Sequence, residues 1–400
     1  MRKMRKMKKW LPIALSATLV GVSVGGIMNG QFVSAAVETD YTAYTATISS
    51  STEKKTIPLL SGDILEFASA YEKLSSEKYL PSTYPKESTY REDDFAPTPM
   101  TLEWDNEEGA LYYTVKVATN SDLSDAVSYL TFEPSIELSD LYMGTEYYYQ
   151  IIAKYSDKIV KSCIFDFETA YLPRTISIEG VSNTRDIGGY YTVDGTKRVR
   201  QGMIYRGAHM ENMTQAGKNA FLYTYKIKTD LDLRGSRGIS PLGDAVNFVN
   251  VSAPYYVSEE HGICSTADSS TSFWSGTYKD ALIKEIKTFA DPENYPIYIH
   301  CSLGRDRTGT LAFLINALLG VGEQELYMDY ELTFFSQAGC GGEYVSSMIN
   351  VPFTNLYKMI NAYGFKTTLA ARTEAFLLDL GITQAEIDSI RSIMLEEVDA

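Results

Sequence analysis

Residues 299–310 read IHCSLGRDRTGT and place a thiol, Cys301, six positions before a guanidinium, Arg307. The apolar run YPIYI precedes this stretch, and RTGTLAFLINALLG follows it with apolar residues at helical spacing. A loop between a strand and a helix presents several backbone N–H groups to one point, where the helix dipole adds positive charge. That field favours a thiolate, and an arginine closing the loop can bind two phosphate oxygens. The stretch therefore predicts a phosphoryl-transfer site.

The elements that must position this loop alternate between strand and helix from about residue 176 onward. KTDLDL and YPIYIH have the composition of short strands, whereas YKDALIKEIKTFA has the spacing of an amphipathic helix. EAFLLDLG and TQAEIDSIRSIMLEEV close the chain as helices, the second with a Thr N-cap signal. This alternation predicts an α/β domain over residues 176–400, with a central, mostly parallel sheet flanked by helices.

Three further motifs precede the loop: VSNTRDIGGY (181–190), GMIYRGAHM (202–210) and KTDLDLR (228–234). Together with HCSLGRDRTG (300–309), they resemble in order the N-x-R-D-x-G-G-Y, Y-R-S/G, D-L-R and HC-x5-R-T motifs of one family. That family is the bacterial tyrosine and lipid phosphatase branch of the cysteine-dependent tyrosine phosphatase superfamily. The resemblance covers roughly residues 174–400. It implies a phosphatase that needs no metal or cofactor.

The resemblance also implies roles for the residues of the loop. Cys301 is expected to be the nucleophile, and Arg307 to bind the phosphoryl group. Thr308 is expected to bond the thiolate or to assist hydrolysis of the cysteinyl-phosphate, while His300 holds the loop from behind. The remaining positions are expected to bind substrate through backbone amides; they are Ser302, Leu303, Gly304, Arg305 and Asp306.

The general acid is open between two interpretations. Many relatives carry an Asp on a loop after the D-L-R strand, but VNVSAPYYVSEEHGICSTADSS has no Trp-Pro-Asp, only Glu259, Glu260 and the more distant Asp268. The bacterial branch often has Asp directly before the loop arginine, and Asp306 matches that position. Asp306 is therefore our candidate for the acid that protonates the leaving oxygen. The alternative is a structural carboxylate bonded to loop amides.

Other charged residues of the motifs are expected to support the loop. Arg185 and Asp186 are interpreted as a buried ion pair that orders the N-terminal motif. Asp232 and Arg234 are interpreted as a strand-end pair beneath the loop. Relatives often carry Lys at position 305, so Arg305 keeps a second cation associated in the family with phosphoinositide or broad substrate acceptance. His209 is expected to be a solvated loop residue, with assistance at the rim as the alternative.

Residues 96–171 have different chemistry from the phosphatase-like part. MTLEW, ALYYTVKVAT, SIELSDL, EYYYQIIAKYSD and SCIFDFET are short runs rich in Tyr, Val, Thr and Ile, with turn residues between them. They predict an all-β sandwich that resembles a fibronectin type III domain, with Trp104 as its early core tryptophan and Tyr147 in its tyrosine-corner strand. Tyr147, Tyr148 and Tyr149 are expected to alternate between core and surface, in preference to forming a carbohydrate-binding strip.

The N-terminal ninety-five residues divide into two segments. Residues 1–36 combine a basic start, an apolar run and small residues before Val37, which predicts a cleaved secretory signal; an uncleaved anchor is the alternative. Residues 37–95 are polar, except for ILEFASAYEKL (64–74), whose apolar residues have helical spacing. The predicted location is therefore secreted or at the cell surface, with no transmembrane segment after cleavage.

Charge and cysteine content exclude several functions. The chain has 36 basic and 51 acidic residues, and removing residues 1–36 with their six basic side chains takes the net charge from −15 to −21. Such a chain is not expected to bind nucleic acid through its bulk charge. The cysteines are Cys163, Cys264, Cys301 and Cys340, without metal spacing, so no metal site is expected.

The leading hypothesis is a secreted phosphatase whose first-choice substrate is a phosphotyrosine protein. Dual specificity, phosphoinositide hydrolysis and the scavenging of inositol phosphates remain open. The alternative from a different class is a surface protein that binds phosphorylated ligands for adhesion. A sulfurtransferase or an arsenate reductase also uses an activated cysteine, but the Arg–Thr–Gly after the loop and the upstream motifs disfavour both.

Overall fold

The computed structural model describes residues 43–45, 56–71, 95–235, 238–252, 277–336 and 360–398. The predicted signal and the carboxylates Glu259, Glu260 and Asp268 lie outside these ranges. Contacts divide the chain into two compact units. One comprises Met1–Ile57 and Pro99–Ala170, and the other comprises Pro58–Thr98 and Tyr171–Ala400. In the described ranges, no helix has both the length and the apolar character that crossing a bilayer requires.

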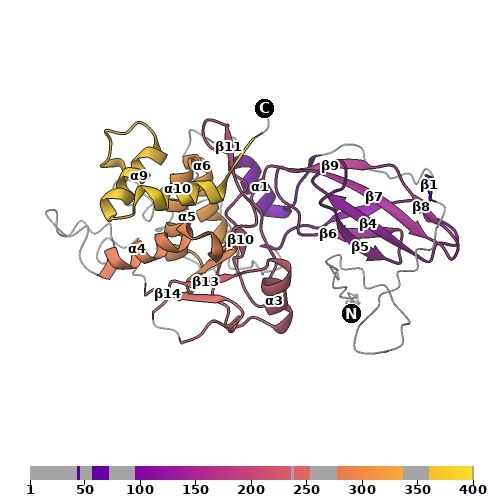
Figure 1. Ribbon diagram of the computed structural model, residues 1–400, viewed down its shortest axis with the longest axis horizontal. Helices are drawn as coiled ribbons and strands as arrows, with labels where there is room; N and C mark the ends of the chain where they lie inside the picture. Colours follow the sequence, from indigo (N-terminus) through magenta and orange to yellow (C-terminus); the bar gives the residue numbers. More distant parts are fainter. Residues whose placement is uncertain are drawn as a thin grey trace, which may run out of the picture. The chain divides into compact units, whose positions relative to one another are not determined.

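The second unit is built on a five-stranded sheet in the order β10-β12-β15-β13-β14 (Figure 1). Only the β10–β12 pair is antiparallel in this sheet, which confirms the mostly parallel arrangement. The central strand β15 reads IYIH and is buried at all four positions, as expected of a parallel strand covered on both faces. The strands are β10 (Arg185–Asp186), β12 (Ile204–Gly207), β13 (Thr229–Asp232), β14 (Asn247–Asn250) and β15 (Ile297–His300).

Side-chain alternation along β15 creates the two faces of the core. Tyr298 packs in an apolar cluster with Phe221, and the two ring centroids lie 4.7 Å apart. Ile297 and Ile299 are fully buried on the opposite face. The π-helical turn Ala220–Thr224, which continues α3 (Gln215–Asn219), contributes Phe221 to the cluster and packs Ala220 and Leu222 against it.

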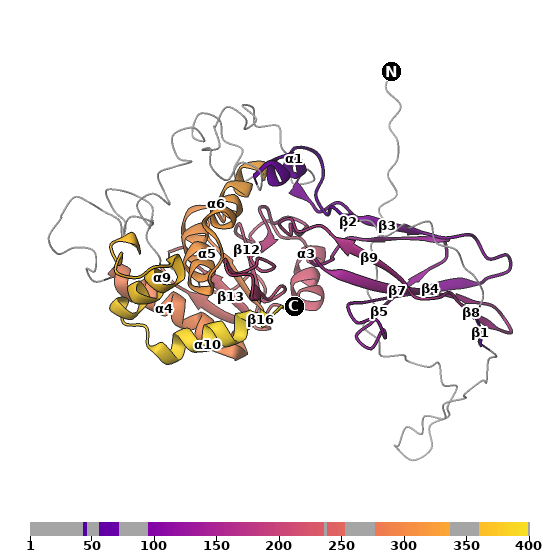
Figure 2. The same cartoon turned by 90° about the horizontal axis from the view of Figure 1, so that it is seen from above.

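Helix α5 (Asp306–Leu319) is the central helix of the unit and packs against β12 and β15 (Figure 2). It is buried continuously from Arg307 to Leu319, as expected of a helix that is apolar around most of its circumference. The helix ends at Gly320, whose φ of 92° is the left-handed conformation that glycine adopts without steric cost. The burial fixes the N-terminus of α5, and hence Arg307, relative to the sheet.

The remaining helices surround α5 and the sheet. Helix α9 packs on α5, and α10 packs on α4 (Figure 1). The Thr383 N-cap signal is confirmed, since Thr383 and Glu386 form a reciprocal capping box at the start of α10. A short antiparallel pair joins β11 (Lys197–Val199) to β16 (Leu395–Glu397). The helices are α4 (Thr277–Ala290), α6 (Glu323–Glu331), α9 (Leu369–Leu380) and α10 (Gln384–Met394).

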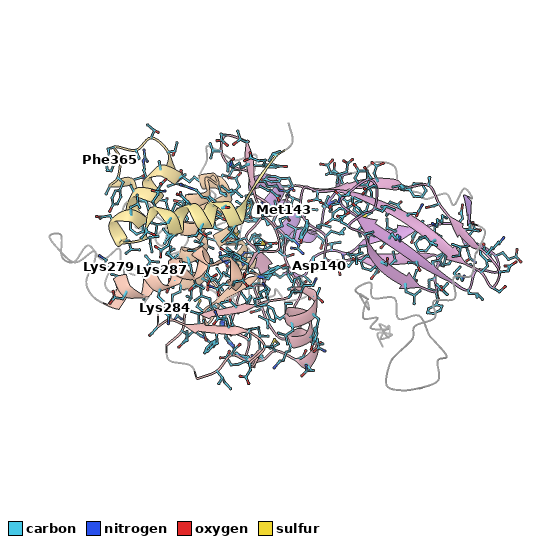
Figure 3. The ribbon with its side chains drawn as sticks, in the orientation of Figure 1. Asp140, Met143, Lys279, Lys284, Lys287 and Phe365 are labelled. Atoms are coloured by element: carbon cyan, nitrogen blue, oxygen red, sulfur yellow. The ribbon has the colours of Figure 1, made fainter. Side chains whose placement is uncertain are left out.

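The amphipathic pattern of α4 is also confirmed. Leu282, Ile286 and Phe289 are buried. On the other side of the helix, Lys284 and Lys287 are exposed and Lys279 is partly exposed (Figure 3). Lys284 donates to the carbonyl of Asn250 at 3.1 Å, and Lys287 pairs with Glu386 of α10 at 2.9 Å. Lys284 and Lys287 therefore link α4 to the segment after β14 and to α10.

The helical spacing in residues 64–74 corresponds to α1 (Gly62–Tyr71). This helix belongs to the same unit as the sheet of β15. Ile64, Phe67 and Ala68 are buried, and the ring centroid of Phe67 lies 4.9 Å from that of Phe335. Part of the predicted N-terminal segment 37–95, including α1, thus belongs to the C-terminal unit.

The first unit contains a seven-stranded sheet and a separate two-stranded sheet, β3–β6. The larger sheet runs β1-β8-β7-β4-β5, and β9 links β2 to β7. Tyr147 and Tyr149 of β7 are buried while Tyr148 is partly exposed, which confirms the expected alternation. The strands are β1 (Ala43–Thr45), β2 (Thr56–Ile57), β3 (Met100–Glu103), β4 (Tyr112–Ala118), β5 (Val127–Thr131), β6 (Ser135–Leu138), β7 (Glu146–Lys154), β8 (Ile159–Lys161) and β9 (Phe165–Thr169).

Candidate active site

Cys301 begins the loop that joins β15 to α5, and its side chain is buried. Gly304 lies within this loop at a φ of +67°, a conformation that side-chain-bearing residues rarely adopt. A Cβ atom at this position would lie 2.2 Å from the carbonyl oxygen of Gly207. The glycine is therefore required both by the backbone conformation and by the close approach of β12.

The environment of Cys301 favours its thiolate. Burial alone would raise the pKa of the thiol. Hydrogen bonds from the side chain and backbone of Thr308, together with the positive charge of Arg307, lower the pKa more strongly. The negative charge of Asp306 opposes this effect, but the pKa of Cys301 still falls below its ordinary value of 9.0. The sequence prediction of an activated thiol thus has a specific geometric cause.

Arg307 is buried at the first turn of α5 and connects the loop to a neighbouring strand. Its Nη1 donates to the carbonyl of Leu233, directly after β13, at 2.9 Å. Its Nη2 lies 3.4 Å from Oγ of Ser302. The carbonyl of Leu233 therefore sets the orientation of the guanidinium beside the loop that starts at Cys301.

The carbonyl groups of the loop are held from outside by two motif side chains. Nδ2 of Asn183 donates to the carbonyl of Leu303 at 2.9 Å, and Nη2 of Arg206 donates to the carbonyl of Gly304 at 2.6 Å. In a planar trans peptide the C=O and the following N–H point in opposite directions. The N–H groups of Gly304 and Arg305 therefore point away from these donors. This is the amide orientation that an anion cradle requires.

Asp329 of α6 is a supporting residue that sequence reasoning missed. Its carboxylate accepts from Nε of Arg185 at 2.8 Å and from Nη1 of Arg206 at 2.5 Å. All three side chains are buried. Burial raises the pKa of Asp329, but the two arginines lower it further, so that the net pKa is below its ordinary value. Asp329 thus compensates the charges of both arginines and orients Arg206 toward the loop.

Arg185 and Asp186 are both buried, but the predicted ion pair between them is wrong. Arg185 pairs with Asp329, whereas Asp186 pairs with Arg174 at 2.8 Å. Asp186 also accepts from the backbone N–H groups of Gly188 and Gly202. The physical reason is that adjacent residues of a strand point to opposite faces, so the two side chains meet different partners.

Asp232 and Arg234 form a two-point ion pair at the end of β13. Nε and Nη2 of Arg234 donate to the two carboxylate oxygens of Asp232 at 2.9 and 2.7 Å. Arg234 also donates to Glu211, whose other oxygen contacts Nδ1 of His209. His209 is about one-third exposed, with a side-chain relative accessibility of 34%. Its backbone N–H donates to the carbonyl of Ser302 at 3.3 Å, which places this motif beside the loop.

His300 is buried beneath the loop, between two carboxylates. Its Nε2 lies 2.9 Å from Oδ1 of Asp230, and its Nδ1 lies 4.0 Å from Oδ1 of Asp232. Burial and Arg234 lower the pKa of His300, but the hydrogen bond and charge of Asp230, with the charge of Asp232, raise it above its ordinary value of 6.5. The two carboxylates therefore favour the imidazolium form of His300 and hold the ring in position.

The raised pKa of His300 makes its contribution to stability dependent on pH. A group whose pKa is higher in the folded state contributes its full stabilisation at pH values below its pKa in the unfolded chain. This contribution is lost as the pH rises through the pKa of the folded state. We expect His300→Gln to lower the free energy of unfolding by about 1–3 kcal/mol at pH 6 and by less at pH 9. Urea unfolding of both proteins across this range measures the difference. A destabilisation that grows with pH would contradict the assignment.

Asp306 is the first residue of α5. Within the described part of the chain, its carboxylate accepts hydrogen bonds from two side chains, those of Arg305 and Tyr330. Nε and Nη2 of Arg305 approach its oxygens at 3.2 and 3.4 Å. The hydroxyl of Tyr330 donates to Oδ1 at 3.0 Å. The alternative in which Asp306 is bonded to loop amides is therefore not the arrangement seen.

The described ranges contain no group of three or more His, Cys, Asp or Glu side chains arranged to hold a metal ion. Cys163 is an exposed free thiol in the first unit. Cys264 and Cys340 lie outside the described residues.

Part of the chain is similar in sequence to curated proteins named as tyrosine-protein phosphatases. Over 169 residues the chain is 28% identical to a Cupriavidus necator protein named as a tyrosine-protein phosphatase, covering 39% of this chain and 61% of that protein. It is 29% identical over 86 residues to OCA1 of Saccharomyces cerevisiae, another protein with that name, covering 22% of this chain and 35% of OCA1. The chain therefore spans less than two thirds of the length of these curated relatives.

Two solved structures are similar to part of this chain. The catalytic core of Siw14, a PP-IP phosphatase from S. cerevisiae, is 19% identical, with 40% of this chain and 88% of that chain covered and a TM-score of 0.25. TpbA of P. aeruginosa is 15% identical, with 47% of this chain and 97% of that chain covered and a TM-score of 0.28.

The fold is α/β, and it places a cysteine and an arginine on one strand-to-helix loop whose carbonyls are held from outside. The sequence profile of the tyrosine phosphatase family matches residues 176–396, which is more than half of the chain. The chain belongs to the tyrosine phosphatase family.

Proposed function

We propose that this chain is a phosphatase that hydrolyses phosphomonoesters through a cysteinyl-phosphate intermediate on Cys301. The observation that carries the proposal is the lowered pKa of Cys301 on a loop that Arg307 closes. A thiolate nucleophile, oriented amides and a fixed guanidinium are the parts that a covalent phosphoryl transfer needs. The reaction requires no metal or cofactor.

The proposed reaction has two steps. In the first, the Cys301 sulfur forms a bond to phosphorus while the bond to the leaving oxygen breaks, and Asp306 gives that oxygen a proton. In the second, water attacks phosphorus, the sulfur–phosphorus bond breaks, and the Asp306 carboxylate takes a proton from the water. Arg307 and the amides of the loop hold the phosphoryl oxygens throughout. Thr308 stabilises the departing thiolate.

The first-choice substrate is a phosphotyrosine protein, and the second choices are phosphoserine or phosphothreonine proteins and phosphoinositides. Arg305 supports the wider range, because it places a second guanidinium one residue before Asp306 in the same loop. Inositol phosphates are a further candidate substrate. We also propose that residues 1–36 act as a cleaved secretory signal, so that the substrate is met outside the cytoplasm.

For residues 96–171 we propose a fibronectin type III-like domain that binds, spaces or docks and performs no chemistry. Two features support this. Trp104 is buried with its ring centroid 5.2 Å from that of Tyr113. The Tyr147 hydroxyl accepts from the backbone N–H of Tyr142, five residues upstream, at 2.7 Å, which is the bond of a tyrosine corner.

Phosphate release by the chain without residues 1–36 tests the proposed function. The panel comprises 4-nitrophenyl phosphate, phosphotyrosine and phosphoserine peptides, phosphoinositides and inositol phosphates, with EDTA and a reductant present. We expect release that EDTA does not inhibit, with phosphotyrosine peptides cleaved at the highest kcat/KM. If no substrate is cleaved but phosphorylated peptides bind, the adhesion alternative replaces the phosphatase. If EDTA abolishes release, the thiolate mechanism is wrong.

A further inference from the structure

Tyr330 is a buried tyrosine on α6 whose hydroxyl reaches the candidate proton donor of the active site. Its side chain is 1% exposed, and its hydroxyl donates to Oδ1 of Asp306 at 3.0 Å. Residues 330 and 306 are 24 positions apart and lie on different helices. The contact therefore depends on how α6 packs against α5.

The ring of Tyr330 is held against the backbone of α5. A Cβ atom added at Gly309 would lie 2.7 Å from Cδ2 of this ring, so the ring occupies the space that a side chain would need. A ring in direct contact with a helix backbone cannot swing away without unpacking α6. The position of the phenol oxygen is thus fixed relative to the first turn of α5, where Asp306 lies.

The phenol of Tyr330 acts as a donor at every physiological pH. Burial raises its pKa well above the ordinary value of 10.0, and the negative charge of Asp306 raises it further. A protonated phenol in this position can donate its hydrogen only to the acceptor in front of it, which is Oδ1 of Asp306. Arg305 approaches both oxygens less closely, with Nε 3.2 Å from Oδ1 and Nη2 3.4 Å from Oδ2.

We infer that Tyr330 is a positioning residue for proton transfer: it fixes the Asp306 carboxyl group through Oδ1, so that Oδ2 is the oxygen that exchanges a proton with the leaving group. This inference rests on the proposed function. As the phosphorus–oxygen bond breaks, the Oδ2–H bond breaks and the leaving oxygen gains the proton. The resulting carboxylate keeps the Tyr330 hydrogen bond and recovers a proton from the attacking water in the second step.

The test compares the wild type, Tyr330→Phe, Asp306→Asn and the double variant on two esters. Phenyl phosphate has a poor leaving group that needs protonation, whereas 4-nitrophenyl phosphate releases a stable anion. We expect Tyr330→Phe to reduce kcat on phenyl phosphate about 10-fold, with KM unchanged, and on 4-nitrophenyl phosphate less than about 3-fold. On phenyl phosphate, the kcat of Asp306→Asn should be about 10²–10⁴-fold lower than that of the wild type, and the kcat of the double variant should fall no further.

The matched control is Tyr295→Phe. Tyr295 is also buried, and its hydroxyl donates to the carbonyl of Phe289 at 2.7 Å, so this variant loses a comparable bond elsewhere. We expect it to retain wild-type kcat on both esters. Circular dichroism establishes that each variant is folded.

Three outcomes would overturn the inference in different ways. Equal losses on both esters in Tyr330→Phe would show a purely structural role. If Asp306→Asn lost kcat equally on both esters, Asp306 would not be the proton donor that Tyr330 is proposed to position. A wild-type chain that cleaves neither these esters nor any other substrate of the panel above would overturn the proposed function itself, so the two failures are distinguishable.

Discussion

Replacing Cys301 with serine should reduce phosphate release at least about 10⁴-fold on every substrate that the wild type cleaves. A serine hydroxyl is not ionised near neutral pH, whereas Thr308 and Arg307 hold the pKa of the Cys301 thiol below its ordinary value. The variant therefore lacks the nucleophile that forms the phosphorus–sulfur bond. Because kcat falls and the phosphoryl-binding groups remain, the variant should still bind a phosphotyrosine peptide. Steady-state kinetics and isothermal titration measure the two quantities.

Cys163→Ser is the matched control for this variant. Cys163 is an exposed free cysteine in the other compact unit, so its replacement should leave kcat/KM unchanged. Residual activity in Cys301→Ser within about tenfold of the wild type would show that another group attacks phosphorus. Loss of both activity and peptide binding would instead show that the thiol supports the loop rather than the chemistry.

Replacing Asp329 with asparagine should destabilise the chain by about 3–5 kcal/mol and also impair phosphate release. The substitution keeps the size of the side chain but removes the negative charge between the guanidiniums of Arg185 and Arg206. Both of these side chains are fully buried, and Asp329 is their acidic partner in the described structure. An uncompensated buried charge is costly, and two of them repel each other.

The activity loss follows from the contact between Arg206 and the carbonyl of Gly304 at 2.6 Å. If Arg206 shifts, the amides of the loop lose their orientation, so kcat/KM should fall even at temperatures where the variant remains folded. Urea unfolding and kinetics at 15 °C measure the two effects. Asp388→Asn on the exposed side of α10 is the control and should change stability by less than about 0.5 kcal/mol. A destabilisation of Asp329→Asn below about 1 kcal/mol would refute the central role of this carboxylate.

The local pattern of residues was sufficient to predict much of the C-terminal unit. The runs KTDLDL and YPIYIH became β13 and β15, and the helical spacing after Arg307 became α5. The prediction of β15 succeeded because burial on both faces of a parallel sheet selects a nearly continuous apolar run, and that of α5 because a buried helix repeats its apolar residues with a period of 3.6. In the first unit, β1, β2, β5 and β8 were not predicted.

Partners distant in the sequence could not be predicted in this way. Asn183 reaches the carbonyl of Leu303 across 120 positions, and Arg185 reaches Asp329 across 144. The adjacent pair Arg185–Asp186 suggested a local ion pair, but the alternation of a strand separates the two side chains. Asp329 and Tyr330 lie in the last turn of α6, EQELYMDYE, and only their burial shows that their polar groups need partners.

The sequence by itself determined the chemistry of this protein: a cysteine and an arginine six positions apart, between an apolar strand and a helix, in the order of motifs of one phosphatase branch. Only the tertiary structure decided which groups hold that chemistry in place. Asp329 compensates two buried arginines, Tyr330 reaches Asp306 from another helix, and α1 joins the C-terminal unit. The reason is physical: covalent spacing fixes neighbours within one turn or loop, whereas buried charges and donors are satisfied by whichever elements the packing brings together.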